Sequence, residues 1–164
     1  MRFLRLDLIT LPLALLLMAG GPSSGIHHLA DSDRDQLLHS VAFRIRDQVD
    51  LLPQSVRTAF IKSLKAKSFS MADPGGKFQE TDVILEEGLP IRRLVFAAQS
   101  PDYLVLHYEM GGFGLSHHVL LFKLSGSSAE LVWRATARQK FNSLKDLKLA
   151  VRQNKLDDDP AYYW

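Results

Sequence analysis

The chain has 164 residues, of which 46% are hydrophobic and 23% are charged, with 20 Lys and Arg against 18 Asp and Glu. This balance is typical of one globular domain and excludes a disordered chain, a coiled coil and a polytopic membrane protein. A net charge of +2 is too small to indicate a nucleic-acid-binding protein. Because the sequence has no cysteine, disulfide scaffolds, zinc ribbons and thiol nucleophiles are excluded as well.

The N-terminus has the pattern of a secretory signal peptide. Arg2 and Arg5 precede an apolar run from Leu8 to Met18, and small residues follow as far as Gly25. The run is too short to cross a bilayer, which takes a helix of about 20 residues. We therefore predict a leader over residues 1–25 and a single α+β domain over residues 26–164. A buried N-terminal helix and a retained anchor stay open. An exported chain without cysteine favours a bacterial periplasmic or extracellular location.

Two amphipathic helices are predicted next. After a capping-box-like start at Ser32, apolar residues recur at spacings of three and four from Leu38 to Leu52. Pro53 interrupts the pattern, and a second apolar stripe runs from Val56 to Leu64. The two segments indicate a helical pair. A short strand over residues 81–85 is a further candidate.

Four runs rich in β-branched and aromatic residues follow, and they cover residues 91–99, 103–110, 115–124 and 129–136. The separating loops are short enough for hairpins, so the runs predict a four-stranded antiparallel meander in chain order. Ser143 then caps a last helix that carries Leu147 and Val151 on its apolar side. The expected fold is α+β, with the helical pair and the C-terminal helix packed on one face of the sheet.

The hairpin loops also predict which side chains share a face of the sheet. A two-residue turn and two four-residue loops place opposite charges and apolar side chains across from each other, which stabilises a sheet. The predicted pairs are Ala98 with Val105, Leu120 with Trp133, Phe122 with Leu131, and Lys123 with Glu130. The face expected to be covered carries Leu94, Phe96, Ala98, Val105, Leu120, Phe122, Leu131 and Trp133. A slip of one residue would move all side chains of a strand to the other face.

This register gathers polar residues at one end of the sheet, beside a glycine-rich turn at residues 111–114. His107 falls opposite His118 on the covered face. One step further along, Glu109 falls opposite Ser116, and an arginine lies near the same end. The candidate site therefore consists of His107, His118, Glu109 and Arg92.

Three interpretations of this site stay open. A neutral and a protonated histidine supply a base and an acid near neutral pH, and an arginine can hold an anion, which suits phosphodiester or ester hydrolysis. His107, His118 and Glu109 also match a two-histidine, one-carboxylate metal site. In the structural interpretation, Arg92 pairs with Glu109 and the two histidines hydrogen-bond to each other or to the backbone. His117 is expected on the opposite face, exposed to solvent.

The sequence favours a non-enzymatic binding, inhibitory or envelope-associated module that needs no cofactor. A small secreted hydrolase and a metal-binding protein are the alternatives. The aromatic C-terminal residues Tyr162, Tyr163 and Trp164 are a candidate contact for a protein partner, unless they fold back onto the core. We expect neither nucleic-acid binding nor a membrane span once the leader is removed.

Overall fold

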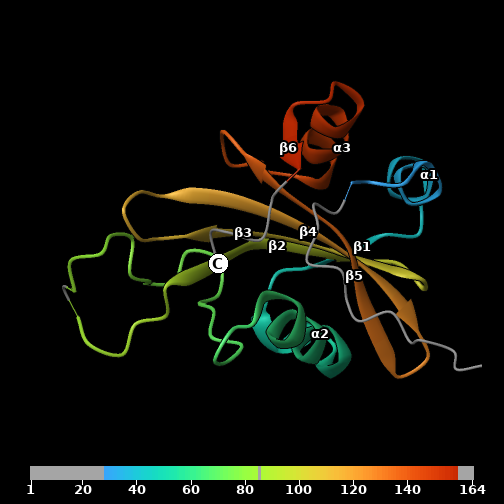
Figure 1. The fold of residues 1–164 in the computed structure, drawn as a ribbon. Helices are drawn as coiled ribbons and strands as arrows, with labels where there is room; N and C mark the ends of the chain where they lie inside the picture. The colour runs from blue at the N-terminus through green and yellow to red at the C-terminus, as the bar shows by residue number, and fades with distance from the viewer. Residues whose placement is uncertain (1–27, 85, 159–164) are drawn as a thin grey trace, which may run out of the picture.

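The computed structural model describes residues 28–84 and 86–158, and within them it has an α+β fold (Figure 1). The helices are α1 (Asp31–His39), α2 (Gln54–Leu64) and α3 (Leu144–Arg152), with a 3-10 turn η1 at Val49–Leu51. One antiparallel sheet contains β1 (Arg44–Arg46), β2 (Arg92–Gln99), β3 (Tyr103–Met110), β4 (Ser116–Ser125), β5 (Ser128–Ala137) and β6 (Leu156–Asp158). The strands lie side by side in chain order.

Parts of the predicted chain fall outside the described residues, namely the leader over residues 1–25 and the aromatic tail. Among the helices that the structure describes, none is both long and apolar enough to span a membrane.

The sheet has six strands rather than the predicted four. The four central strands, β2 to β5, follow the predicted meander, and the short strands β1 and β6 extend it at its two edges. A strand of three residues is too short to show the alternation by which strands are found in a sequence. Residues 81–84 form no strand, and only Thr81 makes an isolated bridge, to Gly112.

The first predicted helix is too long. α1 begins at Asp31, after Ala30, and ends at His39, and the chain then becomes extended. The apolar spacing that continues to Leu52 belongs to β1 and η1 instead of a helical face. Val41, in the connection between α1 and β1, is 93% exposed and therefore does not belong to a buried helical face. The other two helices match their predictions: α2 starts after Pro53, and the Ser143 hydroxyl accepts a hydrogen bond from the Asp146 amide at 3.2 Å.

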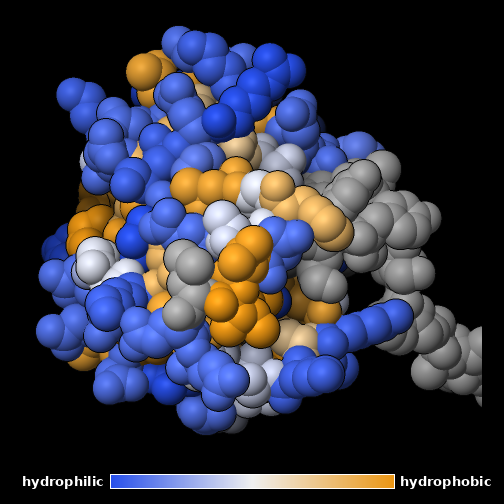
Figure 2. Space-filling model, turned by 90° about the vertical axis from the view of Figure 1, so that its left-hand side faces the viewer, coloured by the Kyte–Doolittle hydropathy of each residue, from blue (hydrophilic) through white to orange (hydrophobic). Residues whose placement is uncertain are grey.

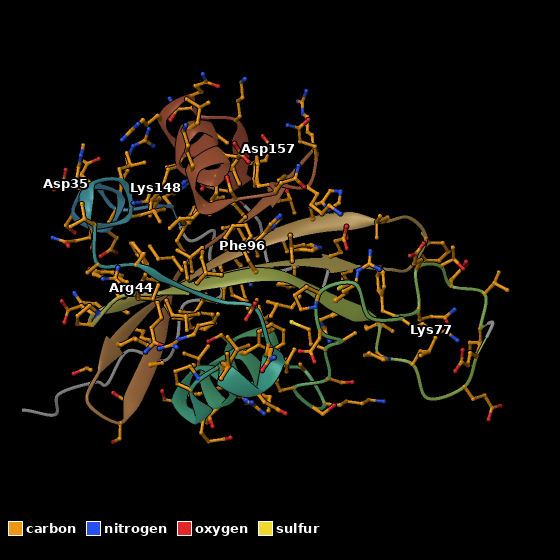
Figure 3. All side chains as sticks on the ribbon, turned by 180° about the vertical axis from the view of Figure 1, so that it is seen from behind. Asp35, Arg44, Lys77, Phe96, Lys148 and Asp157 are labelled. Carbon is orange, nitrogen blue, oxygen red and sulfur yellow. The ribbon has the colours of Figure 1, made fainter. Side chains whose placement is uncertain are left out.

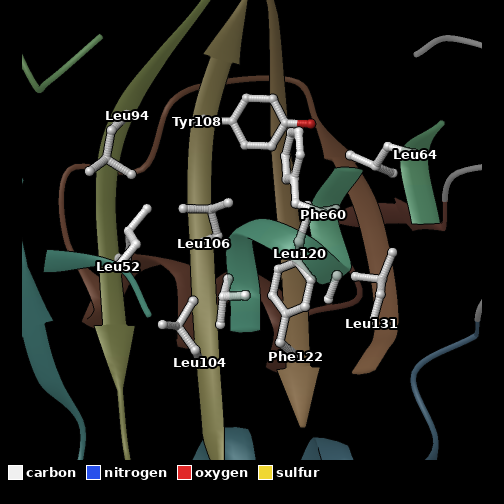
Figure 4. Packing of buried hydrophobic residues seen from close by; sticks show 13 residues of the cluster. Leu52, Phe60, Leu64, Leu94, Leu104, Leu106, Tyr108, Leu120, Phe122 and Leu131 are labelled. Atoms are coloured by element: carbon white, nitrogen blue, oxygen red, sulfur yellow. The ribbon is translucent and has the colours of Figure 1, made fainter. Parts of the chain in front are cut away.

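Helices cover both faces of the sheet, whereas the sequence predicted one. Figure 1 shows α2 on one side and α1 and α3 on the other. The α2 core packs Phe60 of α2 against side chains such as Leu106 and Leu120 (Figure 4). The α3 core packs Leu147 of α3 and Leu37 of α1 against the opposite face. Phe96, labelled in Figure 3, belongs to this second core.

Two β-bulges explain how the sheet supplies both cores. Val95 in β2 and Val132 in β5 are extra residues, and each moves the following side chains of its strand to the other face. The predicted pairs Ala98–Val105, Phe122–Leu131 and Lys123–Glu130 are confirmed. Trp133 pairs with Leu121 instead of Leu120 because of the bulge at Val132. The bulges and a one-residue shift of the β3–β4 register, which pairs Val105 with Leu121, divide the predicted covered face. Its members in the α2 core are Leu94, Leu120, Phe122 and Leu131, and its members in the α3 core are Phe96, Val105 and Trp133.

Candidate functional site

The β3–β4 hairpin decides where the four candidate residues lie. Its loop is five residues long, residues 111–115, and the Ser116 hydroxyl donates to the Met110 carbonyl at 3.1 Å where the strands resume pairing. The prediction had a four-residue loop, so the observed register is shifted by one. His118 lies opposite Tyr108 rather than His107, and Glu109 lies opposite His117 rather than Ser116.

This shift separates the candidate residues, because neighbouring residues of a strand point to opposite faces. His107 and Glu109 lie on the face covered by α3. His118 and Arg92 lie on the face covered by α2, where the Arg92 guanidinium is 5.4 Å from the centre of the Phe60 ring. The structure therefore brings the residues together as two pairs, on either side of the sheet, and does not form the predicted four-residue site.

His107 is a buried residue that joins three segments. Its Nδ1 lies 2.9 Å from the His118 carbonyl oxygen, and its Nε2 accepts the Phe141 amide at 3.0 Å. A neutral imidazole with its proton on Nδ1 satisfies both contacts. Burial lowers the pKa of His107 from 6.5 to about 4. The residue therefore ties β4 and the segment before α3 to β3, in agreement with the structural interpretation.

His118 is also buried and neutral. Its Nε2 lies 2.8 Å from the Ser116 hydroxyl oxygen, and its ring stacks on Tyr108 with 5.2 Å between the ring centres. Burial, followed by the positive charge of Arg92, lowers the pKa of His118 to about 3. A general acid must be protonated at the pH at which it acts. With these lowered pKa values, neither His107 nor His118 is in its protonated, imidazolium form near pH 7.

Glu109 is the centre of a polar cluster, but its partner is Arg93 and not Arg92. The Arg93 Nε and Nη2 atoms lie 2.8 and 2.7 Å from one carboxylate oxygen of Glu109. The Lys140 Nζ and the His117 Nδ1 lie 3.7 and 3.9 Å from the other oxygen. The Glu109 side chain is 4% exposed, so two cations compensate a carboxylate that is almost removed from water.

Three partners of Glu109 do not belong to the predicted site, namely Arg93, His117 and Lys140. His117 was expected to be exposed on the other face, and its side chain is 14% exposed on the same face as Glu109. Burial lowers the pKa of His117, against the opposing effect of the Glu109 charge. In the described part of the chain, no three or more His, Asp or Glu side chains are arranged to hold a metal ion.

Three clefts lie elsewhere, with volumes of about 360, 410 and 350 Å³. The first lies beside Trp133 and α3, and the other two flank the segment around Phe141. None of the four candidate residues lines any of these three clefts.

Two loops at one end of the sheet, residues 79–84 and 111–115, are joined by backbone contacts. Thr81 bridges to Gly112, and the buried Gln79 side chain donates to the carbonyl groups of Thr81 and Val83. A Cβ atom at residue 111 would lie 1.9 Å from the Gln79 carbonyl oxygen, so only glycine permits this close approach. The segment around residues 79–84 and the hairpin loop 111–115 thus form one built surface.

Apolar side chains gather on this surface in contact with solvent. Phe113 is fully exposed, and Ile84 and Val83 are 72% and 61% exposed. In the described residues, five of the nine exposed large hydrophobic side chains lie at this end. We call them the end surface: Val83, Ile84, Ile91, Phe113 and Leu115. Figure 2 views this end of the molecule and shows orange apolar atoms surrounded by blue hydrophilic ones.

The sequence contains one signal for the end surface, within the glycine-rich turn at residues 111–114. Phe113 stands between glycines in a hairpin loop, where a large aromatic side chain has no neighbouring strand residue to pack against.

No protein-family model, no curated protein sequence and no solved structure matches the chain.

Proposed function

We propose that this chain is an exported, non-enzymatic binding module whose end surface contacts a protein partner. The observation that carries the proposal is the exposure of Phe113, Val83 and Ile84 on two loops that a backbone bridge joins. Exposed apolar groups that cluster within a polar surround are typical of interaction sites. Aromatic residues at the centre of such a site commonly supply most of the binding energy.

The loops favour binding because their geometry exists before a partner arrives. The Gln79 side chain and the close packing of Gly111 hold both loops in place. A preformed surface loses little conformational entropy on association, which leaves more of the contact energy for affinity. Export is supported by the leader pattern over residues 1–25. For an exported chain, the lack of cysteine favours a bacterial source over a eukaryotic one.

The hydrolase and metal alternatives both require His107 and His118 on one face. The β3–β4 register places these residues on opposite faces, which separates the ligands of a metal site and the acid from the base. Their lowered pKa values also leave neither histidine protonated as a general acid near pH 7. The geometry therefore supports a binding role better than either alternative.

The binding role can be tested by photo-crosslinking in the source cells. A photoreactive phenylalanine analogue replaces Phe113 in the full chain, and the same analogue replaces Val41, which is 93% exposed in the α1–β1 connection. We expect a defined adduct from position 113 that position 41 does not give. Co-purification of the same protein should be lost in Phe113→Asp and kept in Val41→Asp. Identical adducts from both positions would contradict the proposal.

Export has a separate test. N-terminal sequencing of the protein recovered from the cell envelope or the medium should start at Ile26. Recovery of a chain that starts at Met1, confined to the cytoplasm, would contradict export without bearing on the end surface.

A further inference from the structure

We propose that the end surface selects a basic, apolar peptide segment of its partner protein. This inference rests on the proposed function and adds the chemistry of the partner. It starts from the charges that surround the apolar side chains. The loop sequence from residue 77 to 91 carries four acidic residues against one lysine, while residues 110–116 carry no charge. The two loops are therefore acidic in a chain whose net charge is +2. The cations next to them are directed elsewhere, since Arg92 lies over the Phe60 ring and Arg93 and Lys140 lie beside the buried Glu109. The four acidic residues are Glu80, Asp82, Glu86 and Glu87.

Little of this negative charge is compensated within the protein. Lys77 pairs with Glu86 at 3.1 Å, which uses the one lysine of the loop. Asp82 and Glu87 are exposed and form no ion pair with any described residue. Arg93 lies 3.9 Å from Glu80, but the buried Glu109 holds this guanidinium at 2.7 Å. The loops that carry the apolar end surface thus also carry Glu80, Asp82, Glu86 and Glu87, which we call the acidic rim.

The rim determines which partner fits. Charges on opposite surfaces act over a Debye length of about 8 Å at physiological ionic strength, so the rim attracts lysine and arginine side chains that approach the apolar centre. An anionic lipid surface or a nucleic acid would meet the same rim with its own negative charge. A partner segment that carries aliphatic or aromatic residues flanked by cations satisfies both the centre and the rim.

The arrangement of the loops also favours side-chain recognition over strand addition. The backbone of Thr81 already bridges to Gly112, and the carbonyl of Val83 already accepts from Gln79. These groups are therefore occupied and do not offer the row of free backbone donors and acceptors that strand addition requires. The contact is made by the exposed side chains of the end surface.

The inference is tested with a displayed library of random peptides, selected against the immobilised full chain. We expect the selected peptides to be enriched in lysine and arginine together with aliphatic or aromatic residues. Their affinity should fall by about tenfold or more in Phe113→Asp and by several-fold in the double variant Asp82→Asn, Glu87→Gln. It should also fall as the salt concentration rises. The matched double control Asp35→Asn, Asp50→Asn also removes two charges, from side chains that are 70% and 96% exposed, and should leave the affinity unchanged.

The outcomes separate this inference from the proposed function. Basic apolar peptides whose binding depends on Phe113 and on the rim support both. Neutral or acidic peptides that still depend on Phe113 overturn the partner chemistry and leave the binding role in place. A selection that yields no Phe113-dependent peptide overturns both. Flotation of the wild type, but not of Phe113→Asp, with lipid vesicles would overturn the choice of a protein partner. Because Phe113 is exposed, melting curves of its variants should match that of the wild type.

Discussion

Acid should unfold this protein through its two buried histidines. His107 uses its Nε2 lone pair to accept the Phe141 amide at 3.0 Å, so a proton at Nε2 must displace this hydrogen bond in a site without solvent. His118 is buried on the other face, close enough to the Arg92 charge to have its pKa lowered by it. Both side chains are stable in the core only when they are neutral.

The sign and size of the effect follow from the pKa values. Each histidine has a pKa of 6.5 in an unfolded chain, against about 4 for His107 and about 3 for His118 in the folded protein. As the pH falls below 6.5, the unfolded state takes up protons that the folded state cannot, so stability falls. By pH 5 the penalty is about 2 kcal/mol for each residue, and about 4 kcal/mol together. The loss continues until the pH reaches the folded pKa of each histidine.

Urea unfolding at pH 7.5 and at pH 5 measures this difference. We expect the free energy of unfolding of the wild type to be lower at pH 5 by at least about 4 kcal/mol, a large fraction of the 5–15 kcal/mol typical of a domain. The lowered pKa of His117 acts in the same direction. His107→Gln, which does not titrate, should show about half of that pH dependence. The control His39→Gln removes an exposed histidine and should keep all of it. The reasoning is refuted if the wild type changes by less than about 1 kcal/mol, or if His107→Gln keeps the full dependence.

Three further predictions concern stability. Glu109→Leu leaves Arg93 without its buried partner and should lower the free energy of unfolding in urea by about 3–5 kcal/mol. Adding Arg93→Met should recover much of this loss, and a double variant no more stable than the single one would count against the buried pair. Gly111→Ala should lower the free energy of unfolding by about 1–3 kcal/mol, because its Cβ meets the neighbouring loop. Gly114→Ala, whose Cβ meets nothing within 4 Å, is the control, and equal effects would disprove the close packing of the loops. Phe60→Ala should cost about 3–5 kcal/mol, and a cost below about 1 kcal/mol would show that α2 does not pack on the sheet as described.

The central fold could be predicted because its signals are local. β2 to β5 are runs rich in β-branched and aromatic residues and are joined by short loops, and Ser143 is a helix cap that acts within one turn. The edge strands carry no such signal because they depend on pairing with residues far along the chain. The bulges at Val95 and Val132 insert one residue each, and no residue type marks them in the sequence.

The candidate site depended on a single loop length. With residues 111–115 in the loop instead of 111–114, His118 moves to the face opposite His107, and His117 takes its place beside Glu109. A pattern of hydrophobic residues could not settle this choice, because β3 is buried on both faces and either register places apolar side chains in a core. The residue types at this end of the sheet were therefore predictable, while their grouping was not.

The burial of β3 on both faces also affects how the protein loses structure. Every residue of this strand from Tyr103 to Glu109 is buried, with Leu104 and Leu106 in one core and Val105 in the other. Detaching α2 would expose one face of β3 to solvent, and detaching α3 would expose the other face. Because both helices pack on this strand, the loss of one helix destabilises the packing of the other. We expect the two halves to unfold as one cooperative unit, with the β3 amide protons exchanging with solvent only when the whole domain opens.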